Sequence, residues 1–179
     1  MFALRKSQDA AGRLNAGATT TVGAEAHGPY DPSSQGERRL ARRLLRHWQE
    51  LPRTARLPLV SAVDPSAIGE DWDNCFLIDC RKGVDFPNFC YLGGKLARFS
   101  GVFLQGEGRW TTTVLDRATA DIRRAVETEE VVTSEDELKL FDGRRLLFRA
   151  VLLPMSEDGL RLTHLLGGAS GLLLGAARG

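Results

Sequence analysis

Two Asp-Gly dipeptides near the end of the chain, Asp142-Gly143 and Asp158-Gly159, constrain the fold more than any other feature. An Asp-Gly pair between two extended apolar runs is a strong signal for a β-hairpin, because glycine adopts the positive φ that tight turns require. Here the two pairs separate three such runs, at residues 130–141, 144–156 and 160–168. The sequence therefore predicts a three-stranded antiparallel meander.

The centre of the chain predicts two further strands and a helix. The strands are expected at 74–80 and 89–101, and the adjacent Gly93 and Gly94 indicate a bulge or a close approach by a ligand or another backbone. Thr113 can cap a helix that follows. The apolar stripe of that helix comprises Leu115, Ala118, Ile122 and Val126. Five antiparallel strands with connecting helices over one face give an α+β fold.

Composition divides the chain into four segments. Residues 1–33 hold few large apolar side chains, so they cannot offset the entropy of ordering and we expect a flexible tail. Residues 34–52 predict an N-terminal helix, and 53–170 a single folded domain that holds the five strands. Residues 171–179, which glycine interrupts, are expected to be a C-terminal tail.

The N-terminal helix is amphipathic. Ser34 and Glu37 fit a capping box at its start, and Pro52 ends it. Its apolar stripe must be covered by the sheet or by a second subunit, and we expect a homodimer. The residues of this stripe that would form the dimer or partner contact are Leu40, Leu44 and Trp48.

Charge and composition exclude several classes of protein. The formal net charge is +1. The five arginines within 38–46 could meet nucleic acid or an acidic partner, and we interpret them as a solvated helix face in preference to a nucleic-acid contact. No run approaches the roughly 20 apolar residues that cross a bilayer, and no signal peptide is recognisable. The spacing of Cys75, Cys80 and Cys90 fits no zinc pattern, so no metal site is predicted. We expect a cytoplasmic protein that contacts neither nucleic acid nor membrane.

Three stretches resemble a known family: HWQELPRTARLPLVSAVDPSAI (47–68), FCYLGGKLARFSG (89–101) and LLPMSEDGLRLTHLLGG (152–168). With the order of elements, they make residues 37–170 similar to the PAS domain, and especially to a PAS-like family of stand-alone alphaproteobacterial proteins. Met155, where leucine is usual, and the acidic tract at 127–137 depart from that pattern. The resemblance implies a five-stranded antiparallel sheet, a sensory or regulatory role in signal transduction, and no catalytic residue. PAS domains bind haem, flavin, small acids or nothing detectable, so the cofactor is unknown.

Five side chains are candidate ligand contacts. In the expected strand His164 shares a face with Leu162 and Leu166 and should point into the core. A neutral imidazole there could bind a carboxylate or carbonyl, ligate haem iron, or bond to a backbone group without any ligand. Arg98 could clamp a carboxylate or simply be exposed. The other candidates, which could equally be ordinary core aromatics, are Tyr91, Phe103 and Trp110.

The sequence thus predicts a signalling module without chemistry of its own. It contains neither a G-x-S-x-G nucleophile motif nor a G-x-x-x-x-G-K-[ST] phosphate loop. We expect a small ligand in the core, or a protein partner, to change how the N-terminal helix packs. We recognise no output domain after the module in this sequence, and we expect the signal to pass to a separate partner, or the protein to be a stand-alone binder. The rival hypotheses are a ligand-free interaction or scaffold protein with a filled core, and a small enzyme on an α+β scaffold.

Overall fold

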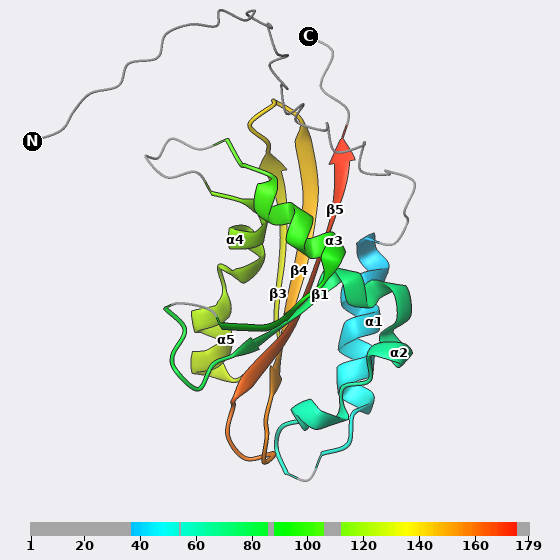
Figure 1. Ribbon diagram of the computed structural model, residues 1–179, viewed down its shortest axis with the longest axis vertical. Coiled ribbons are helices and arrows are strands. Elements are labelled where there is room, and N and C mark those ends of the chain that lie inside the picture. The colour runs from blue at the N-terminus through cyan, green and yellow to red at the C-terminus, as the bar shows by residue number, and fades with distance from the viewer. Residues whose placement is uncertain (1–36, 54, 86–87, 106–111, 175–179) are drawn as a thin grey trace, which may run out of the picture.

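The computed structural model describes residues 37–53, 55–85, 88–105 and 112–174. At its centre is a five-stranded sheet in the order β2-β1-β5-β4-β3, in which every neighbouring pair is antiparallel (Figure 1). This confirms the predicted α+β fold. The strands are β1 (Cys75–Asp79), β2 (Asn88–Leu92), β3 (Val132–Lys139), β4 (Arg145–Met155) and β5 (His164–Leu174).

Helices cover both faces of the sheet. Helix α1 contacts β4 and β5 on one face, and α4 and α5 contact β4 on the other, which we call the α1 face and the cap face (Figure 1). Side chains along β4 alternate between the two cores: Phe148 and Leu152 enter the cap-face core, and Val151 and Leu153 the α1-face core. The helices are α1 (Glu37–Glu50), α2 (Pro65–Ile68), α3 (Gly94–Ala97), α4 (Val114–Thr119) and α5 (Ile122–Thr128), with 3₁₀ turns η1 (Val60–Ala62), η2 (Gly69–Asn74) and η3 (Arg98–Gly101).

The expected helix after Thr113 forms as two short helices, α4 and α5. Thr113 caps α4 as predicted: its hydroxyl accepts from the Asp116 backbone N–H, and the Asp116 carboxylate accepts from the Thr113 N–H. The chain turns between the two helices, so the buried stripe differs from the predicted one, and Leu115 and Val126 are only half-buried. The stripe that packs on the cap face is Val114, Ala118, Ile122 and Ala125.

The predicted apolar stripe of α1 is covered by the chain's own sheet. Leu40 and Leu44 are each 1% exposed and belong to the α1-face core. The indole of Trp48 packs beside them and donates a hydrogen bond to the Pro154 carbonyl, with an N···O distance of 2.8 Å. Because the stripe is already buried within one protomer, it does not require a second subunit, and the argument for a homodimer through these residues is lost. The predicted cap at Ser34 lies outside the described residues.

Two strands, β2 and β5, have clearly different boundaries from those predicted. Strand β2 ends at Leu92 because Gly93 lies against the backbone of η2, where a Cβ atom would come within 2.4 Å of the Asp73 carbonyl oxygen. The predicted close approach to another backbone is therefore confirmed. The predicted strand is too long, because residues 94–101 form α3 and η3. Strand β5 begins only at His164 and continues to Leu174, so the prediction that the C-terminal tail starts at residue 171 is wrong for its first four residues.

Candidate functional site

The candidate ligand contacts lie on different elements. Tyr91 on β2 belongs to the α1-face core and stacks on the tryptophan of η2, with ring centroids 4.3 Å apart. Arg98 on η3 is exposed, and Phe103, in the segment after η3, is 44% exposed. His164 is buried at the start of β5. Trp110 lies outside the described residues, so its predicted role is untested.

Large side chains fill the space between the sheet and helices α3 to α5. Phe76, Leu96 and Phe148 are all fully buried there. The Phe76 ring lies directly over Gly167 of β5, where a Cβ atom would come within 2.1 Å of the ring. The glycine therefore makes room for an aromatic side chain of the protein itself, and the described residues pack this region as a core.

A small hollow of about 140 Å³ lies between α1 and α2. Arg43 and His47 of α1 line it, as do Ile68 and Asp71, and Arg43 forms an ion pair with Asp71. The Nε2 atom of His47 is buried without a hydrogen-bond partner among the described residues. The hollow is smaller than the roughly 300–1,000 Å³ of pockets that enclose drug-sized ligands, so it would suit only a very small molecule or ordered water.

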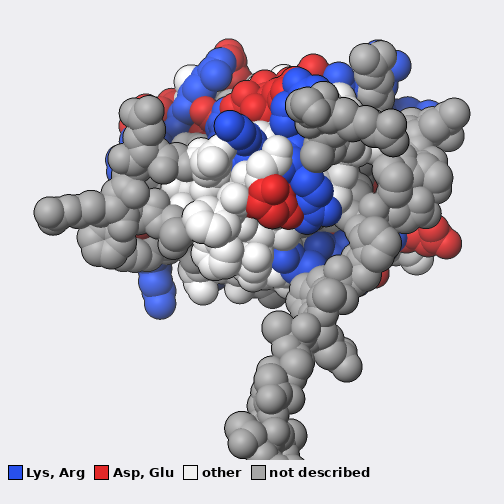
Figure 2. All heavy atoms as spheres, turned by 90° about the horizontal axis from the view of Figure 1, so that it is seen from above, with Lys and Arg blue, Asp and Glu red and all other residues white. Residues whose placement is uncertain are grey.

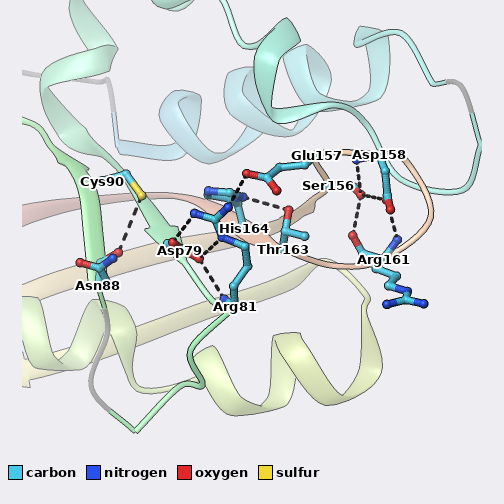
Figure 3. Close-up of polar contacts among 10 residues, drawn as sticks. All are labelled: Asp79, Arg81, Asn88, Cys90, Ser156, Glu157, Asp158, Arg161, Thr163 and His164. Atoms are coloured by element: carbon cyan, nitrogen blue, oxygen red, sulfur yellow. Dashed lines mark hydrogen bonds and ion pairs between the residues drawn. The ribbon is translucent and has the colours of Figure 1, made fainter.

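Polar side chains gather at the end of the sheet where β1 stops and β5 begins (Figure 3). Arg81 clamps the buried carboxylate of Asp79: its Nε donates to Oδ1 at 2.9 Å and its Nη2 to Oδ2 at 2.7 Å. The other end of the guanidinium donates to Glu157 Oε1 at 2.8 Å. His164 lies opposite Asp79, and its Nδ1 is 2.9 Å from the Thr163 hydroxyl oxygen.

Strand register brings a cysteine to the same place. Asp79 of β1 pairs with His164 of β5, so their side chains leave the sheet on one face. On the other side of β1, the pairing with β2 shifts so that Cys90 is an extra residue. Such a β-bulge re-aims side chains, and one donor atom each of Asp79, Cys90 and His164 lies within 4.8 Å of the other two.

The electrostatics of this cluster have clear causes. Hydrogen bonds from the Arg81 side chain and backbone hold the pKa of Asp79 well below its usual range, and the same pairing raises the pKa of Arg81. Desolvation raises the pKa of the neighbouring Cys80 thiol to about 11, with a smaller contribution from the charge of Asp79. At neutral pH, Asp79 is therefore a carboxylate and Cys80 a neutral thiol.

The opposite end of the sheet carries exposed aromatic side chains. Phe141, beside the turn between β3 and β4, is 77% exposed, and its N–H donates to the carbonyl of Phe103 at 3.0 Å. Viewed from above, this end presents uncharged surface bordered by basic and acidic groups (Figure 2). The exposed large apolar side chains at this end are those of Phe103 and Phe141, and exposed aromatic side chains are frequent at protein contact sites.

Comparison with known proteins fits this architecture. The family model described as "PAS domain" matches residues 37–169. The chain belongs to the PAS domain family. Among solved structures, this PAS domain is similar to one titled "Structure of an RNA-binding Light-Oxygen-Voltage Receptor", with 19% identity and a TM-score of 0.39. The match covers 67% of this chain and 37% of the receptor chain, and no curated protein sequence matches.

Family membership makes the PAS domain a sensory or signalling module in general terms. Reasoning from the sequence identified His164 but missed its neighbours, Asp79, Arg81 and Cys90. These residues lie far from His164 in the sequence, and only the pairing of β1 with both β2 and β5 brings them together. Among the described residues of the PAS domain, no helix is long and apolar enough to cross a membrane.

Proposed function

We propose that this PAS domain is a non-catalytic regulatory module that signals by contact with another protein. The observation that carries the proposal is the packed cap-face core. Phe76, Leu96 and Phe148 occupy the space where a ligand enclosed between the sheet and helices α3 to α5 would lie. A domain whose interior is filled by its own side chains can transmit a signal only through its surface. We infer that this domain responds when a partner protein binds to that surface.

The exposed aromatic end is the surface that best suits such a contact. Phe103 and Phe141 are two of three large apolar residues, Leu160 being the third, that are exposed within the part of the chain that the structure describes. A backbone hydrogen bond joins them, and the antiparallel bridge between Leu104 and Leu140 places them opposite each other, where side chains share one face. Aromatic side chains contribute strongly to protein interfaces because they bury a large area with few rotatable bonds. The occupant proposed is a protein that offers apolar side chains to this end.

The experiment is photo-cross-linking in the source cells from a reactive amino acid placed at position 139, next to the aromatic end. The Phe141→Ser variant should lose the cross-linked product, because serine removes an exposed aromatic contact. Leu160→Ser is the matched control, since Leu160 is also exposed but lies in the loop at the other end of the sheet. That variant should retain the product at the wild-type level.

Mass spectrometry of the product then identifies the partner. A different protein, or a second copy of this chain, would support the proposal if Phe141→Ser removes it and Leu160→Ser does not. Equal yields from wild type and both variants would contradict the proposal, as would the absence of any cross-linked protein.

Binding of a small ligand is the second candidate function. The observation that favours it is the unpartnered Nε2 of His47 in the hollow between α1 and α2. A ligand there would touch α1 directly and could change how this helix packs on the sheet. Native mass spectrometry of the wild type and of His47→Ala distinguishes the two candidates: a bound small molecule lost only in the variant would favour ligand sensing.

A further inference from the structure

We propose that Asp79, Cys90 and His164 bind one divalent transition-metal cation, with Zn²⁺ as the best fit. Their carboxylate, thiol and imidazole groups are the three side-chain types that bind Zn²⁺ in proteins. One donor atom from each already lies within 4.8 Å of the other two. Three protein ligands would leave the fourth tetrahedral position open for water or for a group of another molecule.

The distances require only a small contraction. Metal–ligand bonds of about 2.0–2.3 Å place the donor atoms of a tetrahedral Zn²⁺ site roughly 3.5 Å apart. Asp79 and His164 are fixed on paired strands in the centre of the sheet. Cys90 lies on the edge strand β2, is exposed, and is the extra residue of the bulge, so its side chain can rotate toward the other two. The site can therefore close without moving the core.

The neighbouring residues have the arrangement that orients metal ligands. The hydroxyl of Thr163 lies 2.9 Å from His164 Nδ1, and when Nδ1–H donates to it, the Nε2 lone pair is free for a metal. The Asp79 carboxylate accepts three hydrogen bonds from Arg81, which fix its plane. A carboxylate has about four lone-pair sites, so one stays available. Such outer contacts commonly hold metal ligands in place.

The charges of the cluster also accommodate a cation. The positive charge of Arg81 is shared between Asp79 and Glu157, so it does not leave an uncompensated cation beside the site. Cys90 would bind as the thiolate, and its proton is released to solvent when the sulfur–metal bond forms. The site is independent of the proposed protein contact. His164 pairs with Met155 at the last residue of β4, whereas Phe141 lies beside the β3–β4 turn at the other end of that strand. Figure 1 shows the two ends of β4.

Titration of the metal-free full chain with Co²⁺, a spectroscopic substitute for Zn²⁺, tests the proposal. We expect one equivalent to bind, with a sulfur-to-cobalt charge-transfer absorption that excess Zn²⁺ removes. Cys90→Ala should lose that absorption, and Cys80→Ala, a matched substitution of a nearby buried cysteine, should keep it. Thr163→Val should weaken binding by about 10–100-fold, because it removes the contact that orients His164.

Two results would overturn the metal site. One is the absence of stoichiometric Co²⁺ binding by the wild type, and the other is an unchanged charge-transfer absorption in Cys90→Ala. Circular dichroism of metal-free Cys90→Ala should match the wild type, since Cys90 is exposed on an edge strand. Asp79→Asn provides a second variant of similar shape, and it should lower the affinity while leaving the sulfur-to-cobalt absorption present at saturation.

Discussion

The cap face and the α1 face of the sheet are both buried, but they are closed by different kinds of side chain. On the cap face, Phe76 and Phe148 fill the interior, and Gly167 leaves space for the Phe76 ring. On the α1 face, Leu40, Leu44 and Trp48 of α1 cover the middle of the sheet, and the polar residues around His164 lie at its end. The two sites proposed above therefore lie on the surface and on the α1 side of this PAS domain, outside the packed cap-face core.

Phe76→Ala should have the largest effect on stability and would sharpen this comparison most. Removing a fully buried aromatic side chain leaves a cavity, and such substitutions cost about 3–5 kcal/mol of unfolding free energy. Denaturant unfolding measures the loss. Phe141→Ala is the control, because the side chain is mostly exposed and its loss should change stability by less than about 0.5 kcal/mol. A small loss for Phe76→Ala would show that the capped interior is not tightly packed.

Leu44→Ala tests the α1 face and should follow in size. Deleting a buried leucine costs about 2–5 kcal/mol, and fewer atoms are lost than in Phe76→Ala. Light scattering should give the same mass for wild type and variant, because Leu44 packs on its own sheet beside Gly168. A wild-type dimer that dissociates in Leu44→Ala would show instead that α1 lies at a subunit interface.

Gly167→Ala examines the same cap-face contact from the opposite side. The added methyl would lie within 2.1 Å of the Phe76 ring, so the ring must move, and overpacking of this kind costs about 1–3 kcal/mol. Gly143→Ala cannot serve as the control for Gly167→Ala, because Gly143 has a positive φ and alanine there would add backbone strain. The informative control is the double variant Phe76→Leu with Gly167→Ala, which should recover part of the loss. No recovery would mean that the clash is not with Phe76.

Arg81→Met tests the polar end of the α1 face through its pH dependence. It leaves the buried Asp79 carboxylate with the Arg81 backbone N–H as its remaining donor among the described residues, so it should destabilise the fold at neutral pH. Arg81 lowers the pKa of Asp79, so the stabilisation is present above the unfolded-state pKa of about 3.9 and is lost as the pH falls below it. The difference in unfolding free energy between wild type and variant should therefore shrink below about pH 4. A difference that is constant from pH 7 to pH 3 would argue against this pairing.

Local signals in the sequence predicted the meander correctly, but longer-range questions required the structure. Gly143 and Gly159 both adopt positive φ, as the Asp-Gly pairs indicated. The pair Gly93-Gly94 did not reveal that the strand would end there. Glycine is used both at a bulge within a strand and where a strand end passes close to another backbone, so the sequence does not distinguish the two. The apolar stripe of α1 showed that one side must be buried, without specifying which surface covers it.

The candidate site was hidden from sequence reasoning for a related reason. Zinc motifs are recognised when pairs of ligands lie close together in the chain. Here Asp79, Cys90 and His164 come from three neighbouring strands, and a one-residue bulge sets the position of the cysteine. The sequence pattern does not fix how β1 pairs with β2 and β5, nor where the bulge in β2 falls. Only His164 was therefore identified, from its place in an apolar strand.

Native mass spectrometry of the full chain, purified from its source cells, tests most directly whether the capped interior is occupied only by the protein's own side chains. For each copy of the 179-residue polypeptide the account predicts 19.6 kDa, with or without one metal ion at the Asp79–Cys90–His164 site, besides the mass of any bound protein partner. An organic molecule that remains bound in the native spectra of both the wild type and His47→Ala, and is released on denaturation, would contradict it.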